Sequence, residues 1–410
     1  MKYLFCILHF AICIFLCSFI EMPNTVPAGE NPDEFDEFGI RNDKLRLIQD
    51  TTRGGAISYI SLAGNKRNLV NIADEGRYIQ QSYYAGNSVN RQKDGQSPSW
   101  SPWSWNPIQC GDYARHRAQI LETRQTADST YIKCIPMQWD MNNMPAEAIM
   151  EQWTSLCDNV VSVRCRLTCH RTDDIYGEGV LNDQEIPAVY PISALNNLYS
   201  YFGDAPFTGA AIVKTEVIQL ESGFWGRYMT NNGNFPAEKW MAFVDNNGWG
   251  LGVYSPQATQ FLAGRYGRAG GESTSPYTGY IAPLRVEALM KNYVSEYSYY
   301  LIVGTLDEIR AKIYQIHNSL TTSNTTVNKD ENKLKICPNP ANAQIQITNC
   351  ELRKGDKIEI FDLAGNLRES LSVANYQLSF NFDISRLSQG MYFVSVNSAK
   401  RKSATYFIKK

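Results

Sequence analysis

Apolar and polar side chains alternate along much of the chain, and this pattern predicts β structure. Residues 161–170 read Val-Ser-Val-Arg-Cys-Arg-Leu-Thr-Cys-His, so an apolar side chain stands at every second position. A period of two places those side chains on one face of a strand. Residues 54–62 alternate in the same way. A turn sequence at 245–248 separates two further apolar runs, 240–244 and 249–254, which predicts a β-hairpin.

One segment follows a helical pattern instead. Thr305 and Glu308 form a capping box, in which each residue's side chain satisfies the backbone of the other. The apolar residues that follow share one stripe of a helix: Leu306, Ile309, Ile313 and Ile316. No regular alternation of strands and helices occurs, so a parallel sheet is not expected. The pattern favours a mainly β protein with a large antiparallel sandwich.

The apolar pattern at the N-terminus predicts an export signal. Lys2 precedes an apolar run that ends abruptly between Ile20 and Glu21, which indicates a signal peptide at residues 1–20. A transmembrane anchor is the alternative, but the run is short for a bilayer and no cluster of Lys or Arg follows it. No other segment is apolar enough to cross a membrane, so we expect no membrane span after removal of the signal.

The remainder divides at a polar segment. Residues 319–332 are rich in Thr and Asn and have almost nothing to bury, which predicts a linker. Before it lies a main domain at residues 30–318. After it, at residues 333–410, short alternating runs separated by turn sequences predict a small β-sandwich.

Charge and composition narrow the classes of partner. The chain has 39 Lys and Arg against 41 Asp and Glu, a net charge of −2. This balance offers no basic excess for a phosphate backbone, so nucleic acid is not an expected partner. The 24 Tyr and 8 Trp point more strongly to a type of ligand. Their rings combine an apolar face with a polar group, which suits a surface that binds a ligand with both apolar and hydrated parts.

The cysteines do not indicate a metal site. Cys165 and Cys169 lie four residues apart on the apolar face of one strand, about 13 Å at 3.3 Å per residue, which is too far for a disulfide. Their spacing does not fit zinc either, so we expect small buried side chains. A disulfide between Cys337 and Cys350 stays open. No HExxH, acidic calcium loop or CxxC pair occurs, and no metal or cofactor is expected.

Four motifs in the tail resemble a known family. They are Cys337-Pro338-Asn339-Pro340-Ala341, the segment Ile-Phe-Asp-Leu-Ala-Gly at 360–365, the segment from Ile384 to Phe393, and the terminal Phe407-Ile408-Lys409-Lys410. In this order they resemble the C-terminal sorting domain of the type IX secretion system of Bacteroidetes, although an aromatic residue usually stands where this chain has Cys337. The resemblance implies passage across the outer membrane through that secretion machinery, to the cell surface or the medium. An unrelated sandwich, such as a carbohydrate-binding module, is the alternative.

The start of the main domain carries a more local resemblance. Gly54-Gly55-Ala56-Ile57, followed by Asn68-Leu69-Val70-Asn71 and Asp74, resembles the opening of galactose-mutarotase-like supersandwich domains. The resemblance implies a large antiparallel β-supersandwich domain that acts on carbohydrate, followed by the small C-terminal sandwich.

Two segments are unusually rich in groups that suit a sugar. Residues 74–86 combine acids, Arg, Gln and three Tyr, and residues 100–112 contain three Trp together with Pro102 and Pro107, which stiffen the loop. Rings cover the C–H faces of sugars, while amides and charged groups bind hydroxyls. The predicted substrate-binding residues are Arg77, Gln81, Tyr83, Tyr84, Trp103, Trp105, Asn106, Gln109, Tyr190 and Trp240. A structural loop that caps the sandwich is the alternative.

Catalysis at such a cleft needs groups that transfer protons. Glu185 stands out, because Pro187 and Pro191 are expected to fix the loop around it. The predicted catalytic candidates are Glu185, Glu238, Asp112, Asp74 and His170. Glu238 has the simpler alternative of an ion pair with Lys239, and His170 that of a solvated surface residue.

These residues permit three functions. The leading hypothesis is a glycoside hydrolase that acts on a polysaccharide or oligosaccharide. Two carboxyl groups of the protein would carry out the hydrolysis. A polysaccharide lyase would instead use His170 or a Tyr as base, with Arg77, Gln81 or Asn106 on the uronate carboxylate. A surface glycan-binding protein would need the Trp segment and no buried acid.

Overall fold

The computed structural model describes residues 37–217, 219–220, 227–324, 334–348, 352–363, 365–374, 380–398 and 401–410. The predicted signal peptide at 1–20 and residue Cys350 lie outside the described residues. The chain separates into two compact units, one ending at His317 and one beginning at Asn318.

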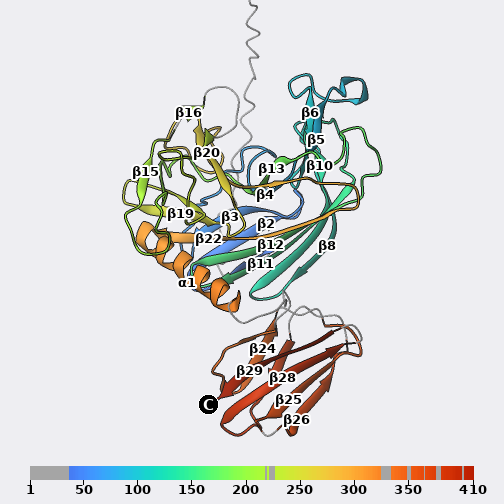
Figure 1. The fold of residues 1–410 in the computed structure, drawn as a ribbon, viewed down its shortest axis with the longest axis vertical. Helices are drawn as coiled ribbons and strands as arrows, with labels where there is room; N and C mark the ends of the chain where they lie inside the picture. The colour runs from blue at the N-terminus through green and yellow to red at the C-terminus, as the bar shows by residue number, and fades with distance from the viewer. Residues whose placement is uncertain are drawn as a thin grey trace, which may run out of the picture. The chain divides into compact units, whose positions relative to one another are not determined.

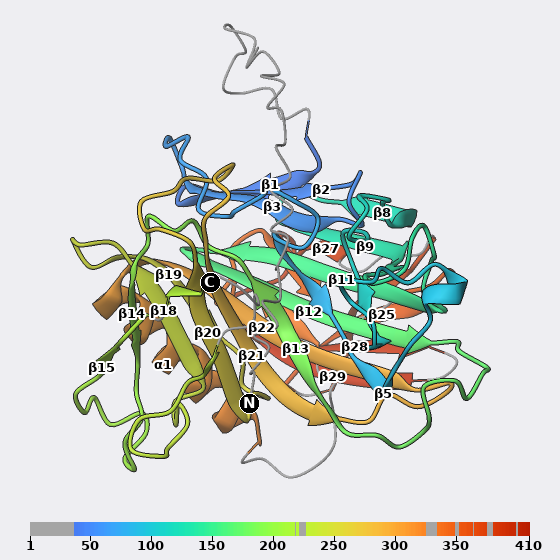
Figure 2. The same ribbon diagram turned by 90° about the horizontal axis from the view of Figure 1, so that it is seen from above.

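The larger unit contains two main sheets (Figures 1 and 2). The first follows the order β1-β2-β3-β4-β13-β21-β20-β16, with β7, β10 and β17 attached beside this path. Its strands are β1 (Gly39–Arg41), β2 (Leu45–Asp50), β3 (Ala56–Leu62), β4 (Ile79–Ser82), β7 (Pro107–Ile108), β10 (Met137–Gln138), β13 (Asn182–Val189), β16 (Gln219–Leu220), β17 (Arg227–Tyr228), β20 (Gln260–Tyr266) and β21 (Thr278–Glu287).

The second sheet follows the order β15-β14-β18-β19-β22-β12-β11-β9-β8. Its strands are β8 (Gln119–Gln125), β9 (Ser129–Ile135), β11 (Ala148–Cys157), β12 (Val160–Cys169), β14 (Asn197–Ser200), β15 (Val213–Thr215), β18 (Trp240–Val244), β19 (Trp249–Tyr254) and β22 (Val294–Thr305). A separate ribbon pairs β5 (Ala85–Val89) with β6 (Trp103–Trp105), and a short 3-10 helix covers Gln92–Asp94.

The inner faces of the two sheets share one hydrophobic core. Ile57 and Ile186 come from the first sheet, and Val163 and Leu301 from the second. On β12 buried and more exposed positions alternate, which confirms the strand predicted from its period of two. Cys165 and Cys169 are buried and unpaired on its inner face, as expected. The predicted antiparallel sandwich is therefore confirmed.

One local prediction is confirmed and another needs correction. The hairpin forms, since β18 pairs with β19 and the Asp245 amide donates to the Trp249 carbonyl at 2.8 Å. The strand predicted at 54–62 begins only at Ala56. Gly54 and Gly55 have φ values of 59° and 72°, and a Cβ on Gly54 would meet the Gln109 carbonyl oxygen at 2.0 Å. These glycines form a tight turn that side chains would block.

The predicted helix is α1 (Leu306–Asn324). Its capping box is formed, with the Thr305 amide donating to Glu308 Oε2 at 2.8 Å and the Glu308 amide to Thr305 Oγ1 at 3.3 Å. Residues 319–324 belong to this helix, so the segment expected as a linker begins within it. None of the helices in the described residues is long and apolar enough to cross a bilayer.

The smaller unit is a sandwich of two small sheets, as the tail pattern predicted. One has the order β23-β24-β27 and the other β26-β25-β28-β29. Its strands are β23 (Lys335–Cys337), β24 (Gln344–Thr348), β25 (Lys357–Asp362), β26 (Leu367–Ser372), β27 (Phe380–Asp383), β28 (Gly390–Ser398) and β29 (Arg401–Lys409). It has a core of its own, which includes Ile347, Ile360 and Phe407.

Candidate functional site

The outer face of the first sheet, opposite the core, carries a cluster of tyrosines around one acid. Strands β13 and β21 lie next to one another (Figure 2), and β4 pairs with the other edge of β13. Glu185 on β13 is paired with Ser82 on β4 and with Leu284 on β21. Successive side chains alternate between faces, so Ile186 enters the core while Glu185 faces outward. We call Ser82, Tyr84, Glu185, Tyr190 and Tyr280 the tyrosine face.

Glu185 is the chemical centre of the tyrosine face. Its side chain is almost fully buried, with 2% of its surface exposed. The hydroxyl of Tyr280 donates to one carboxyl oxygen and that of Tyr84 to the other at 3.4 Å. Burial raises the pKa of Glu185, and the hydrogen bonds from its neighbours offset only part of this effect. A carboxyl group with a raised pKa keeps its proton to a higher pH than an ordinary glutamate does.

The tyrosines themselves are poor bases. Burial raises the pKa of Tyr84, Tyr190 and Tyr280 well above the ordinary value, and the charge of Glu185 adds to the shift in each case. They are therefore neutral hydrogen-bond donors at physiological pH. The rings of Tyr190 and Tyr280 pack against each other at a centroid distance of 5.1 Å.

A row of half-buried indoles borders this face. Neighbouring rings in this row meet edge-on. The distance between ring centroids is 6.2 Å from Tyr84 to Trp103, 5.1 Å from Trp103 to Trp100 and 5.6 Å from Trp100 to Trp139. Their faces remain partly open to solvent. The segment at 100–112 thus places Trp100 and Trp103 at the surface, and their contact with a glycan stays a prediction.

Arg77 and Asp74 lie near Tyr190 of the tyrosine face. They form an ion pair at 3.3 Å, and the Arg77 guanidinium stands over the ring of Tyr266 at 5.8 Å. The charges of Glu185, Arg77 and Asp74 all influence the pKa of Tyr190. The structure therefore brings together Asp74, Arg77, Tyr84, Trp103, Glu185 and Tyr190 from the predicted set.

A second carboxylate lies on the same strand. Asp183 precedes Glu185 by two residues, so both side chains face outward with their Cα atoms about 7 Å apart. Asp183 is partly exposed and accepts a hydrogen bond from the Tyr228 hydroxyl. The segment around Glu185 is thus a strand with a bulge after Glu185, and the fixed loop expected from Pro187 and Pro191 was wrong.

Several predicted binding residues are interior instead. Tyr83 donates to Gln81 at 3.0 Å, Asn106 to the Tyr83 carbonyl at 2.7 Å, and Gln109 to the Gly54 carbonyl at 2.9 Å. All four side chains are at most 1% exposed. Their polar groups satisfy one another inside the sandwich, so they do not contact a glycan.

Trp105 is corrected for the same reason. It is 1% exposed and packs in the main core, with the Arg171 guanidinium 5.1 Å from its ring. Its indole N–H donates to Glu147 at 3.0 Å. Of the three Trp in the segment at 100–112, only Trp100 and Trp103 reach the surface.

Three of the predicted catalytic residues lie elsewhere. Asp112 is fully buried and organises a turn, accepting from the backbone amides of Ala114, His116 and Asn143 and from the His116 ring. His170 is exposed at the end of β12, in the second sheet. Trp240 begins β18 of that sheet, and Glu238 lies in the turn just before it, where its carboxyl group accepts a hydrogen bond from the Trp240 indole N–H at 2.8 Å.

Glu238 is an anchor for α1. It is fully buried, and it accepts from Arg310 at 3.1 Å, from the Tyr314 hydroxyl and from the Phe207 amide at 2.9 Å. Burial by itself raises the pKa of Glu238, but these hydrogen bonds outweigh it and hold the pKa below its ordinary value. The ion pair with Lys239 does not form, since Lys239 donates to the Pro256 carbonyl.

Comparison with known proteins identifies the tail and gives distant structural relatives. Residues 335–410 match the family described as secretion system C-terminal sorting domain. A search among curated proteins found no match. Similar solved structures include a galactose mutarotase related enzyme from Lactobacillus acidophilus, with 10% identity and a TM-score of 0.37 over 66% of this chain and 99% of that one.

Two others are carbohydrate-processing enzymes of different types. A 4-alpha-glucanotransferase from Thermococcus litoralis has 10% identity and a TM-score of 0.35 over 65% of this chain and 38% of that one. A polysaccharide lyase has 9% identity and a TM-score of 0.33 over 90% of this chain and 47% of that one. The C-terminal unit is a sorting domain of the type IX secretion system, and the protein is exported to the cell surface or the extracellular space.

Proposed function

We propose that this exported protein is a glycoside hydrolase that cleaves a polysaccharide at the tyrosine face, with Glu185 as the general acid. The observation that carries the proposal is the buried Glu185 carboxyl, which hydroxyl groups surround and whose pKa is raised. A general acid in glycoside hydrolysis needs such an environment, because it must be protonated near neutral pH and donate to the departing glycosidic oxygen.

Asp183 is the partner that the mechanism requires. Glycosidases pair an acid with a second carboxylate that attacks the sugar or activates a water. Asp183 shares the outward face of β13 with Glu185 and is partly exposed to solvent, which suits either role. The half-buried rings of Trp100, Trp103 and Trp139 would hold the apolar faces of the sugars.

A tyrosine-based lyase mechanism receives less support. Such an enzyme needs a tyrosine that gives up its proton readily, whereas the pKa values of Tyr84 and Tyr190 are raised. Arg77, proposed for the uronate carboxylate, is mostly buried and already bonds to Asp74 and to the Asn71 side chain. These contacts favour proton donation by Glu185 over proton abstraction.

The test is hydrolysis of a panel of polysaccharides by the mature protein, measured as new reducing ends. Glu185→Gln should lower the rate by about 100-fold or more while the melting temperature changes little. Glu122→Gln is the matched control, since Glu122 is an exposed residue whose carboxylate pairs with Arg124 at the surface. Full activity in Glu185→Gln would overturn the assignment. A product that absorbs in the ultraviolet would indicate a lyase, and retention of glycan without product would indicate a binding protein.

A further inference from the structure

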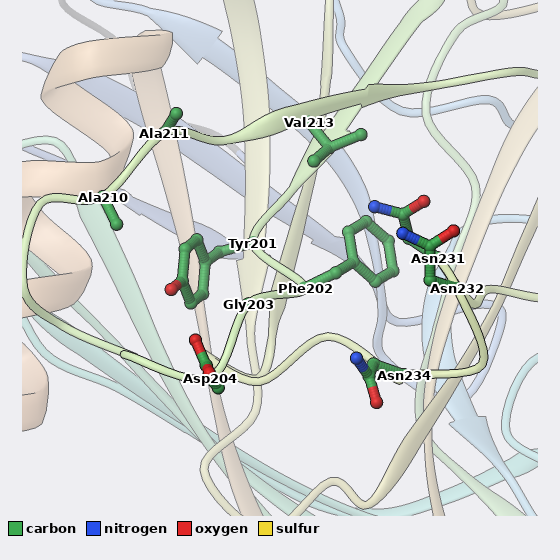
Figure 3. Close-up of a pocket in the computed structure, with 10 residues that line it drawn as sticks. All are labelled: Tyr201, Phe202, Gly203, Asp204, Ala210, Ala211, Val213, Asn231, Asn232 and Asn234. Atoms are coloured by element: carbon green, nitrogen blue, oxygen red, sulfur yellow. The ribbon is translucent and has the colours of Figure 1, made fainter.

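A pocket of about 370 Å³ lies between residues 201–213 and residues 231–234 (Figure 3). The residues that line it are Tyr201, Phe202, Gly203, Asp204, Ala210, Ala211, Val213, Asn231, Asn232 and Asn234. None of them belongs to the site proposed for catalysis. The volume falls within the range of small-molecule sites in proteins.

One wall of the pocket is aromatic and rigid. Tyr201 and Phe202 are 4% and 3% exposed, so their rings are held by the packing around them. The Tyr201 hydroxyl accepts from the Ala205 amide at 3.1 Å, and the Arg310 guanidinium stands over the ring at 5.7 Å. The backbone at Gly203 passes so close that a Cβ would lie 2.4 Å from the Tyr201 hydroxyl oxygen. A glycine is therefore required for this wall.

A second wall presents amide groups. Asn231 and Asn234 close a tight turn through two backbone hydrogen bonds of 2.9 and 3.0 Å, and Gly233 has a φ of 81°. The turn therefore holds itself in shape without its side chains. Within the part of the chain that the structure describes, no hydrogen bond is made by the side chains of Asn231, Asn232, Asn234 or Asp204. They are available to a ligand.

The loop at 203–211 is held in place by contacts on the side that faces α1. The Phe207 amide donates to Glu238 at 2.9 Å, and the Phe207 ring stacks on His317 with a centroid distance of 3.5 Å. The Gly209 amide donates to the Tyr314 hydroxyl at 3.2 Å. These contacts tie the loop to α1. A pocket whose walls are already ordered loses little entropy when a ligand binds.

We propose that this pocket binds an uncharged sugar residue of a glycan, independently of catalysis at Glu185. Rings beside unpaired amides suit the alternating C–H and hydroxyl groups of a sugar. The described lining contains one carboxylate, Asp204, and no Lys, Arg or His. A sugar with a carboxylate or sulfate would be repelled by Asp204 and would find no cation there. The pocket therefore selects neutral glycans over uronate-containing ones.

Isothermal titration of the Glu185→Gln protein tests the proposal, because that variant prevents turnover and leaves the pocket intact. The probes are neutral gluco-, galacto-, manno- and xylo-oligosaccharides, with an oligogalacturonate as the anionic counterpart. At least one neutral series should bind. Adding Asn234→Ala should weaken that binding about tenfold or more, since an amide partner is lost. Adding Asn142→Ala, an exposed asparagine outside the pocket, should leave the dissociation constant unchanged.

A second substitution examines the charge argument and remains informative if Asn234→Ala fails to fold. Asp204→Asn should allow the oligogalacturonate to bind more tightly than it binds the parent. Three results would overturn the proposal: no neutral oligosaccharide binds, a folded Asn234→Ala variant binds as tightly as the parent, or the oligogalacturonate already binds the parent as well as the neutral probes do. Loss of hydrolysis alone would leave it standing, since binding is measured without turnover.

Discussion

At the scale of single residues, Glu185 and Glu238 show how similar side chains acquire different chemistry. Both are buried, yet the pKa of Glu185 is raised while that of Glu238 is lowered. The difference lies in their neighbours. Glu185 meets neutral tyrosine hydroxyls, whereas Glu238 meets the Arg310 guanidinium and an indole N–H. One environment favours a protonated acid and the other a carboxylate that serves as an anchor.

The raised pKa of Glu185 predicts the pH dependence of hydrolysis. As general acid it must carry its proton, so the activity it supports is present below its pKa and is lost as the pH rises through that value. The alkaline limb of kcat/KM should therefore have its midpoint above the ordinary glutamate pKa of about 4.3. A rate profile from pH 3 to 9 checks this. An alkaline midpoint at the ordinary glutamate value would contradict the role.

For Glu238 we predict a loss of stability. Glu238→Gln should lower the free energy of unfolding by about 3 kcal/mol at pH 7, because it leaves the mostly buried Arg310 without its counter-charge. A lowered pKa stabilises the fold above the unfolded value and loses that contribution as the pH falls through the folded value. The difference from the parent should therefore shrink near pH 4. Urea unfolding at both pH values measures it, and a constant difference would argue against an ionised anchor.

How far the sequence predicts the site depends on how its residues are brought together. Tyr84 and Arg77 lie within one dense segment, so local composition was enough to identify them. Tyr280 and Trp139 were missed. Tyr280 reaches Glu185 only because β21 pairs with β13, a register between strands almost a hundred residues apart that no local pattern contains. Asp183 offered a usable signal, since its spacing of two from Glu185 places both acids on one face of a strand.

At the scale of elements, the periodic pattern of apolar residues predicted the strands and the helix correctly where those apolar residues pack into the core. Strand β12, the β18–β19 hairpin and α1 all form where the pattern placed them. Prolines misled the interpretation at 183–191, because a bulge absorbs Pro187 within β13. In β6 the pattern also gives no way to tell Trp103 from Trp105, since the two are alike in type and surroundings along the chain.

Replacing each of the two indoles of β6 in turn should change the free energy of unfolding by different amounts. Trp105→Ala should lower the free energy of unfolding by about 3–5 kcal/mol, because it empties core volume and leaves Glu147 without its indole donor. Trp103→Ala should cost less than half of that, since its ring is half-buried, and should weaken glycan binding instead. Urea unfolding together with binding to a hydrolysed polysaccharide distinguishes the two. Equal losses of stability would contradict the placement of Trp105 in the core and of Trp103 at the surface.

At the scale of the whole molecule, each unit has its own core, so one can be removed without exposing the interior of the other. We therefore predict that deletion of residues 335–410 abolishes export and leaves hydrolysis intact. In a host with the type IX system, the full chain should reach the cell surface or medium, while the shortened chain should remain in the periplasm. Immunoblots of cell fractions measure this.

The Asn142→Ala chain is the matched control for export, since its tail is intact and the substitution is on the surface. Activity in the periplasmic extract, together with resistance to protease, would show that the shortened protein is folded and that its retention is due to the missing tail. Its appearance in the medium would mean that the larger unit carries an export signal of its own. Loss of activity would instead show that the larger unit depends on the tail for folding, contrary to the two separate cores.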